Sequence, residues 1–395
     1  MRGSLTIAVL PLAVAQTLIW AATYYSFPAL LPVWEAELGW SRGEVSGAFT
    51  LALIATALLA PSAGRIIDRG KSWGMFLGGI GLSAVLLMAL SQVTNLWQFW
   101  AIWLAIGVVN AGILYEACFA IITVVTGARA RTGITVVTLV AGFAGTVCFP
   151  AFYVLSEALG WRGAVQVFAA ITAFVSLPLA WTGLRLLEGH HQPPKDRPVA
   201  TGREGQEALR KPAFWALALA FGATGLTHGM LISHIRPIME DAGTGAASAI
   251  LVASMVGPMQ VLGRLIVVSL GARISAFATA VGCFVGMILG LLALLSAGVA
   301  PWLAFIFVVP YGAAWGIISI VRPVLIADFL GRAGYGQIAG MVAVPYMLGG
   351  AMGPILAAVL WSWAGYDLVL GLSVGLVACG ALSLLTARRS TPDGP

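Results

Sequence analysis

Charged side chains are scarce in this sequence of 395 residues, and their scarcity excludes most classes of soluble protein. Asp, Glu, Lys and Arg together make up 9% of the residues, whereas about 25% is usual for a soluble domain. Hydrophobic residues make up 60%, and the 48 glycines and 14 tryptophans are typical of transmembrane helices that pack closely and end among lipid headgroups. A soluble enzyme, a disordered chain and a nucleic-acid-binding protein are therefore excluded. The composition predicts a protein that crosses a lipid bilayer several times.

The sequence also lacks the patterns of metal, nucleotide and catalytic sites. The four cysteines show no metal-ligand spacing and lie in apolar segments, so we interpret them as small buried residues: Cys118, Cys148, Cys283 and Cys379. No G-x-x-x-x-G-K-[ST] loop occurs, so ATP is not the expected energy source and no cofactor is expected. No arrangement of a nucleophile and a base is visible either. We therefore do not expect an enzyme.

Long apolar runs are abundant instead. Twelve runs reach the roughly 20 residues that an α-helix needs to cross a hydrocarbon core. They cover residues 6–33, 44–67, 73–92, 96–125, 133–158, 163–186, 212–239, 246–268, 274–297, 301–329, 336–360 and 367–387. The sequence thus predicts an all-α integral membrane protein with twelve transmembrane helices.

The basic residues predict the orientation of these helices. If the N-terminus is cytoplasmic, every Lys and Arg lies in a cytoplasmic loop or end except Arg42, Arg162, Arg236 and Arg322. The net charge of +6 therefore reflects loops on one side and not a polyanionic partner. We expect a multi-pass protein of the bacterial inner (plasma) membrane with both termini cytoplasmic, and we expect it to be a monomer.

One connection is longer than the others and divides the chain. Residues 187–211 contain three prolines and mixed charge, which is typical of a cytoplasmic linker. They separate a six-helix bundle at 1–186 from a second one at 212–395.

The two halves also repeat each other at a nearly constant offset. Gly127 matches Gly331, Pro150 matches Pro354, and Gly160-Trp161-Arg162 matches Gly365-Tyr366-Asp367. Internal repeats of this kind are typical of secondary transporters.

The loop after the second predicted span carries the most specific motif, Gly64-Arg65-Ile66-Ile67-Asp68-Arg69-Gly70-Lys71. It resembles the loop signature of the major facilitator superfamily, although its tail is one residue shorter than the usual pattern. The resemblance implies a twelve-helix fold with two pseudo-symmetric halves that transports by alternating access. It also implies that Asp68 pairs with Arg129 or Arg131 and faces the N-terminus of the eleventh helix. The alternative is an ordinary positive loop with one incidental acid.

We therefore predict a cytoplasmic gate from this loop and the basic residues after the fourth span. It comprises Gly64, Asp68, Arg69, Gly70, Lys71, Arg129 and Arg131.

Ionisable residues within apolar spans are costly, so each is a functional hypothesis. Glu116 of the fourth span and Arg322 of the tenth lie at nearly equivalent positions of the two halves. We predict that Glu116 carries protons, the alternative being a static buried pair. Arg322 precedes Pro323 and is a candidate anchor for an anion, the alternative being a partner for Glu116 or Asp328.

His228 lies in the seventh span, which is rich in glycine and polar residues. Because histidine changes its charge near neutral pH, we predict that it binds substrate or couples protons, and a neutral histidine bonded to a carbonyl is the alternative. Aromatic residues within spans are the predicted cavity walls: Trp20, Tyr24, Tyr115, Tyr311, Trp315 and Tyr346. Met255 and Met259, with Met230 and His228, also allow a Cu(I) site, although apolar packing is the usual role of such methionines.

Two further segments, Gly39-Trp40-Ser41-Arg42 and Arg129-Ala130-Arg131-Thr132-Gly133, are similar to the monocarboxylate-porter and oxalate/formate-exchanger branch of the superfamily. This resemblance implies proton-linked symport of a small organic anion through the lipid bilayer. Arg322 would anchor the substrate, and Glu116 or His228 would couple protons. The alternatives are proton-driven efflux of cationic or amphipathic drugs, copper uptake, and a sensor that transports nothing.

Overall fold

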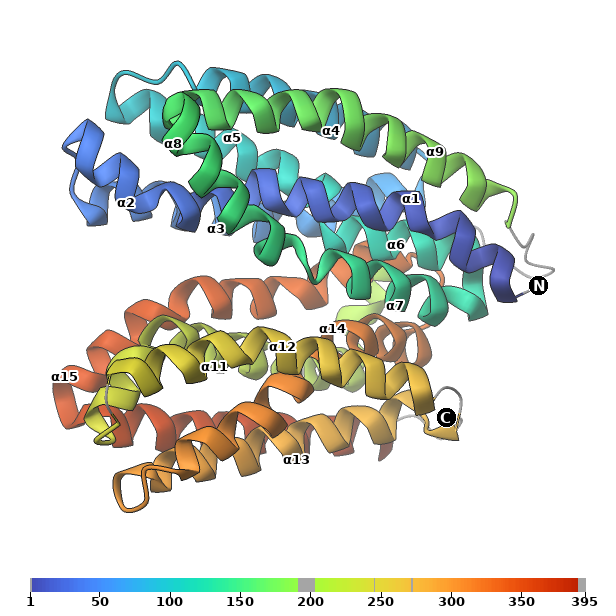
Figure 1. Ribbon diagram of the computed structural model, residues 1–395. Coiled ribbons are helices and arrows are strands. Elements are labelled where there is room, and N and C mark those ends of the chain that lie inside the picture. The colour runs from blue at the N-terminus through green and yellow to red at the C-terminus, as the bar shows by residue number, and fades with distance from the viewer. Residues whose placement is uncertain (1, 191–202, 245, 271–272, 390–395) are drawn as a thin grey trace. The chain divides into compact units, whose positions relative to one another are not determined.

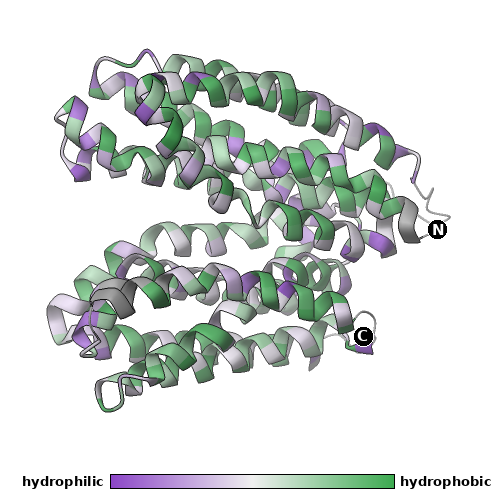
Figure 2. Cartoon of the chain, viewed as in Figure 1, coloured by the Kyte–Doolittle hydropathy of each residue, from purple (hydrophilic) through white to green (hydrophobic). Residues whose placement is uncertain are grey.

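The computed structural model describes residues 2–190, 203–244, 246–270 and 273–389 (Figure 1). Every regular element within these ranges is helical. Helices suit a hydrocarbon environment because each satisfies its own backbone hydrogen bonds. Figure 2 shows hydrophobic residues along the lengths of the helices and hydrophilic residues mainly towards their ends.

The helical segments match the predicted number of membrane crossings. Within the described residues, nine helical stretches are long and apolar enough to span a membrane, and two of them, Ala130–Glu188 and Tyr335–Arg388, run for 59 and 54 residues. A straight helix of that length would exceed about 80 Å, whereas a bilayer core is about 30 Å thick. Both stretches break at a glycine with positive φ, so each forms two crossings. With the shorter apolar stretch Ser254–Leu270, the twelve-helix prediction is confirmed.

The chain forms two compact units. The first contains Met1–Gly202 together with Ala333–Gly340, and its described helices up to Glu188 are coloured blue to green in Figure 1. These are α1 (Arg2–Trp20), the π-helical turn η1 (Ala21–Tyr25), α2 (Ser26–Leu38), α3 (Arg42–Asp68), α4 (Ser72–Leu90), α5 (Leu96–Ile113), α6 (Tyr115–Thr126), η2 (Gly127–Arg129), α7 (Ala130–Ala141), α8 (Ala144–Ile171), η3 (Thr172–Ser176) and α9 (Leu177–Glu188).

Within this first unit, α1 packs against α7 and α9, and α3 packs against α5. Its core contains large aromatic side chains, some stacked, such as Phe152 on Phe168 at 6°, and others at steep angles. Trp34 meets Phe99 at 77°, and Trp103 meets Phe27 at 86°. Edge-to-face and offset-stacked contacts are both ordinary arrangements of aromatic rings in a core.

The second unit contains Arg203–Arg332 and Met341–Pro395. Its described helices are α10 (Glu204–Leu209), α11 (Pro212–Asp241), α12 (Ala246–Leu270), α13 (Ala276–Leu295), η5 (Ser296–Gly298), α14 (Leu303–Leu330) and α15 (Tyr335–Arg389). The first residues of α15, up to Gly340, belong to the first unit. Both α12 and α13 pack against α14. A seam of glycines brings α11 against α15: a Cβ on Gly353 would lie 2.6 Å from the backbone of Gly229.

The structure reproduces the internal repeat of the sequence. Gly160 has φ 69° and ψ 165°, and its match Gly365 has φ 71° and ψ −170°. Only glycine adopts this backbone conformation without strain. The sharp turn between the fifth and sixth crossings therefore recurs between the eleventh and twelfth.

The segment Gly39-Trp40-Ser41-Arg42 ends one helix and begins the next. Gly39 has φ 68° and terminates α2, and Ser41 caps α3 in a capping box with Glu44. Arg42 Nε lies 2.8 Å from Glu35 Oε1 across the turn. The motif is thus a complete stop and start signal for two helices.

Some boundaries differ from the sequence prediction. The first helical stretch continues to Leu38 rather than ending near residue 33, because polar residues such as Glu35 extend a helix beyond the apolar run that hydropathy detects. The predicted linker at 187–211 lies partly outside the described residues. Its described part contains the short helix α10, and the division into halves at 187–211 stays a prediction.

The glycine seam makes a prediction about stability. Gly353→Leu places a side chain where the backbone of α11 already lies, so we expect a loss of about 1–3 kcal/mol of unfolding free energy. The measurement is thermal unfolding of the purified protein in detergent. Gly371→Leu is the matched control because an added Cβ there meets nothing within 4 Å. Equal melting temperatures for the two variants would contradict the close packing of α11 against α15 at Gly353.

Candidate functional site

The first unit gathers aromatic side chains around the π-helical turn of its first crossing. The ring of Trp20 lies 5.0 Å from that of Tyr24 and 4.7 Å from that of Tyr115, and Tyr115 stacks on Phe119 at an interplanar angle of 15°. Trp20, Tyr24 and Tyr115 remain partly exposed. The wider π turn interrupts the regular α-helical register, a feature often found at functional sites.

A helix break positions the side chains that face this turn. Leu114 is extended between α5 and α6, so the carbonyl group of Ile113 loses its place in the helical ladder. The amide of Gln16 donates a hydrogen bond to this carbonyl oxygen at 2.7 Å. Asn110 likewise donates to the carbonyl oxygen of Thr23 at 3.4 Å. These two hydrogen bonds fix α1 and η1 to the end of α5, next to the break at Leu114.

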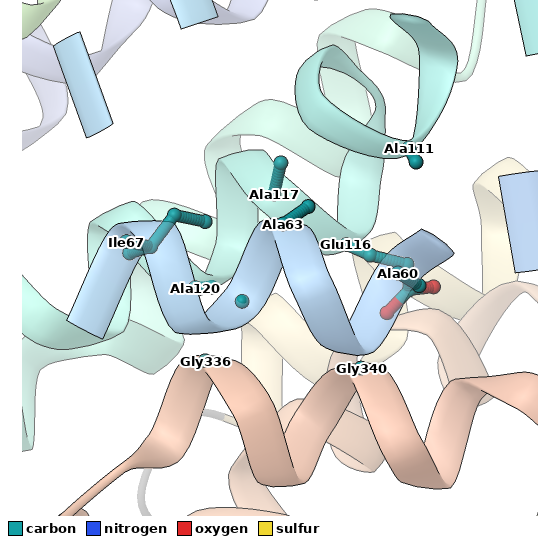
Figure 3. Close-up of a pocket in the computed structure, with 10 residues that line it drawn as sticks. Ala60, Ala63, Ile67, Ala111, Glu116, Ala117, Ala120, Gly336 and Gly340 are labelled. Carbon is teal, nitrogen blue, oxygen red and sulfur yellow. The ribbon is translucent and has the colours of Figure 1, made fainter. Parts of the chain in front are cut away.

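Glu116 occupies the first turn of α6, directly after the break. It reaches a small pocket in which Figure 3 shows its carboxylate beside Ala60. The other lining residues are small or apolar and come from α3, α5, α6 and the start of α15: Ala60, Ala63, Gly64, Ile67, Ala111, Ala117, Ala120, Gly336 and Gly340. Glu116 is thus the one ionisable residue of the pocket lining, and it lies at the positive end of a helix dipole.

Asp68 caps the N-terminus of α15 within the same unit. Its Oδ1 accepts a hydrogen bond from the backbone N–H of Gly336, and its Oδ2 accepts one from Gln337, each at 2.8 Å. These N–H groups have no partner inside the helix, so a carboxylate here provides both a cap and a favourable charge. A Cβ on Gly336 would lie 2.5 Å from the carbonyl oxygen of Gly64, so the two glycines let α3 and α15 meet.

The remaining residues of the predicted gate lie around this contact and beyond it. Arg69 is the C-cap of α3, Gly70 has φ 73°, and Lys71 precedes α4. Arg129 Nη2 donates to the carbonyl oxygen of His190 at 3.1 Å. The pairing of Asp68 with Arg129 or Arg131 stays a prediction.

The second unit aligns planar side chains from three helices. His228 of α11 stacks on Trp315 of α14 with ring centroids 3.6 Å apart, and Trp315 lies 5.8 Å from Tyr346 of α15. Tyr311 also meets His228, with its hydroxyl group 3.4 Å from Nδ1 and the ring centroids 6.2 Å apart. The guanidinium carbon of Arg322 lies 4.1 Å from the ring centroid of Tyr346.

Helical spacing explains why one helix supplies three of these groups. Tyr311, Trp315 and Arg322 are four and seven residues apart, which places them on one face of α14. Tyr311 and Arg322 are buried, whereas His228, Trp315 and Tyr346 keep part of their surface exposed. We call these five residues the planar series.

Every predicted substrate-binding residue lies in one of the two clusters. Trp20, Tyr24 and Tyr115 belong to the first unit, and the planar series contains the other five. Their roles stay predictions. Met230 is fully buried whereas Met255 is exposed, and this difference gives the copper alternative no support.

Sequence reasoning missed the residues that hold the clusters in place. Gln16 and Asn110 were detectable as polar amides inside apolar spans, where each needs a hydrogen-bonding partner. His234 of α11 has partners that the sequence does not reveal: its Nε2 lies 3.2 Å from the carbonyl oxygen of Pro354, and its Nδ1 lies 3.1 Å from the hydroxyl group of Tyr366. Because a carbonyl only accepts, Nε2 donates, and in the neutral ring Nδ1 accepts from Tyr366.

Comparison with known proteins places these features in context. The human protein named monocarboxylate transporter 11 is 26% identical over 266 residues, which is 64% of this chain and 56% of the human protein. The chain thus matches little more than half the length of that relative.

Solved structures share the fold at low sequence identity. The proton:xylose symporter XylE has a TM-score of 0.75 at 14% identity, covering 98% of this chain and 96% of its own. The E. coli fucose:proton symporter FucP has a TM-score of 0.70 at 14% identity, covering 98% and 99%. The human organic anion transporter MFSD10 has a TM-score of 0.67 at 15% identity, covering 97% and 99%.

The sequence profile of one family spans most of the chain. It is that of the Major Facilitator Superfamily, and it matches residues 12–354. The twelve crossings, the repeated glycine turn and the capped α3–α15 contact agree with this match. The chain belongs to the Major Facilitator Superfamily.

Proposed function

We propose that this protein is a secondary active transporter that moves a small organic anion together with protons by alternating access. The observation that carries the proposal is Arg322, a buried cation within the apolar helix α14. Burial of an arginine in a membrane is costly, so its presence there calls for a role. Neutralising the charge of a bound carboxylate is such a role.

The contact with Tyr346 suits this role. The guanidinium carbon of Arg322 lies 4.1 Å from the centroid of the Tyr346 ring, which is within the range of a cation–π pair. The N–H donors of a guanidinium point outward in its own plane, so stacking on its face does not use them. A guanidinium that lies against a ring is the kind of group that binds a carboxylate in a bidentate arrangement.

The names of similar proteins support the same class of substrate. The human relative is named a monocarboxylate transporter, and MFSD10 is described as an organic anion transporter. XylE and FucP are described as proton symporters. Together with the planar series, these names favour an organic anion as the substrate and protons as the coupling ion.

Glu116 is our candidate for the proton-coupling residue. Gly64 and Gly336 line its pocket and also form the contact that Asp68 caps. If the start of α15 leaves α3, the pocket of Glu116 loses one wall and becomes open to water. Protonation of Glu116 and closure of this contact are thereby linked, which is what coupled transport requires.

We further propose that the Asp68 contact is the gate on the cytoplasmic side, in keeping with the orientation that the basic residues predict. The plasma membrane of a bacterium and cytoplasmic termini are parts of the same proposal. His228 belongs to the substrate site in this scheme, because it stacks on Trp315 within the planar series.

The first prediction concerns Arg322. Arg322→Gln removes the cation, and we expect uptake of the anion to fall at least about tenfold because charge-assisted hydrogen bonds are lost. The measurement is uptake of labelled carboxylates by proteoliposomes under an inward proton gradient. Arg332→Gln, at an exposed position just after α14, is the matched control. Uptake at the wild-type level by Arg322→Gln would contradict the role of Arg322 as the substrate anchor. If the protein transports only lipophilic cations, drug efflux becomes the better model.

The second prediction concerns Glu116. In Glu116→Gln we expect proton-driven accumulation to be lost while exchange of labelled for unlabelled substrate continues, since exchange needs no release of the proton. Both modes are measured in the same proteoliposomes. Glu157→Gln alters an exposed glutamate and serves as the control. Accumulation at the wild-type level in Glu116→Gln excludes this carboxylate from coupling.

The third prediction concerns the gate. Asp68→Asn keeps the shape of the side chain but offers the N–H groups of Gly336 and Gln337 an uncharged acceptor. Charge-assisted hydrogen bonds contribute about 1.5–3 kcal/mol, so we expect amide hydrogen exchange at the start of α15 to rise about tenfold or more. Asp367→Asn, an exposed acid later in α15, is the control. Unchanged exchange would show that Asp68 does not hold this helix end.

A further inference from the structure

The break between α5 and α6 has no cause in its own residues. Leu114 has φ −81° and ψ −168°, whereas a helical residue has ψ of about −42°. Leucine is a strong helix former, residues 110–119 contain no proline, and the nearest glycine, Gly112, lies within α5. The Leu114 N–H still bonds the carbonyl oxygen of Asn110, and the Cys118 N–H bonds that of Leu114, so helical pairing reaches the break from both sides. The cause of the break therefore lies on another helix.

Gln16 of α1 supplies this cause. In an uninterrupted helix the carbonyl oxygen of Ile113 would accept a hydrogen bond from the N–H group of Ala117, whereas here it accepts one from the Gln16 amide at 2.7 Å. A side chain that inserts into the helical ladder is a known cause of helix breaks. Trp20 follows Gln16 by one turn, and its ring centroid lies 4.7 Å from that of Tyr115. The helix α1 thus contacts the residues on both sides of the break.

The environment of Gln16 is unfavourable for stability. The residue is fully buried, and its Oε1 meets no donor among the described residues. The amide cannot be turned over to correct this, because the carbonyl group of Ile113 only accepts and must face the Nε2 group. A buried acceptor without a donor costs folding free energy. Stability alone therefore does not account for a glutamine at this position.

The break determines where Glu116 lies. Glu116 is the second residue of α6, and its carboxylate lies beside Ala60 in the pocket between α3, α6 and the start of α15 (Figure 3). Closing the break would turn α6 about Leu114 and place Glu116 in the interior of one long helix.

We infer that Gln16 is a positioning residue for Glu116: by bonding the carbonyl group of Ile113, it holds the break open and keeps Glu116 on the first turn of α6. This inference rests on the proton coupling proposed above and names the residue through which α1 acts on it.

Amide hydrogen exchange of the purified full chain in detergent, followed by mass spectrometry, tests whether Gln16 holds the break. In Gln16→Leu we expect the break to close, so that the N–H groups of residues 115–117 gain helical partners. Their exchange should then slow about tenfold, as one hydrogen bond of typical net strength predicts. A glutamine that merely ties two helices together would give the opposite result, because its loss would speed exchange.

Two further variants assign the effect to the hydrogen bond. Gln16→His keeps an N–H donor at a similar reach and is expected to restore the exchange rates of the wild-type protein. Gln166→Leu is the matched control, since Gln166 lies in the same unit and donates to the hydroxyl group of Ser91 at 3.3 Å, away from the break. It is expected to leave residues 115–117 unchanged.

Transport by proteoliposomes tests the consequence for coupling. In Gln16→Leu we expect proton-driven accumulation to fall at least about tenfold while exchange of labelled for unlabelled substrate continues, which is the split expected for Glu116→Gln. Gln16→His is expected to restore accumulation. A general structural defect would instead lower both modes together.

The outcomes separate this inference from the proposal on which it rests. Unchanged or faster hydrogen exchange at residues 115–117 in Gln16→Leu overturns it, and so does accumulation at the wild-type level in that variant. Loss of both transport modes in Gln16→His as well would show a purely structural role and also overturn it. If Glu116→Gln still accumulates substrate, the coupling proposal fails and the role of Gln16 in coupling fails with it, while hydrogen exchange still decides whether Gln16 holds the break.

Discussion

The need to satisfy every backbone hydrogen bond in a hydrocarbon environment governs this structure. It accounts for the all-helical fold of the described residues, and it also explains where polar side chains occur. Where the helical ladder stops between α5 and α6, Gln16 supplies the missing donor to Ile113. Where α15 begins, Asp68 accepts from two N–H groups that have no partner within the helix. Glu116, directly after the first break, and Asp68 stand at these interruptions.

Small residues allow the helices to approach one another closely. Glycines at the α11–α15 seam and at the α3–α15 contact allow backbones to meet where any larger residue would collide. Helices in a membrane gain little from hydrophobic exclusion of one another, so packing of this kind stabilises their association. At the α3–α15 contact it also creates the pocket of small residues that receives Glu116.

The two units share a backbone repeat but differ in the chemistry of their polar groups. The first places a carboxylate, Glu116, among alanines and glycines. The second places a cation, Arg322, against the ring of Tyr346, and in the same unit His228 contacts the rings of Trp315 and Tyr311. An acid suited to carrying a proton and a cation suited to holding an anion are the two elements that our proposed symport needs. Duplicated folds with unlike side chains are a simple way to provide both.

Much of this could be predicted from the sequence, because its signals are local. Apolar runs of membrane-spanning length predicted twelve crossings, and the cost of burying charge singled out Glu116 and Arg322. The spacing of Tyr311, Trp315 and Arg322 already placed them on one helix face. Only the tertiary structure decided that Gln16 holds the break at Leu114, that four rings align, and that the start of α15 belongs to the first unit. These features depend on which helices become neighbours, and a one-dimensional pattern reports the face that a residue occupies but not the group it meets there.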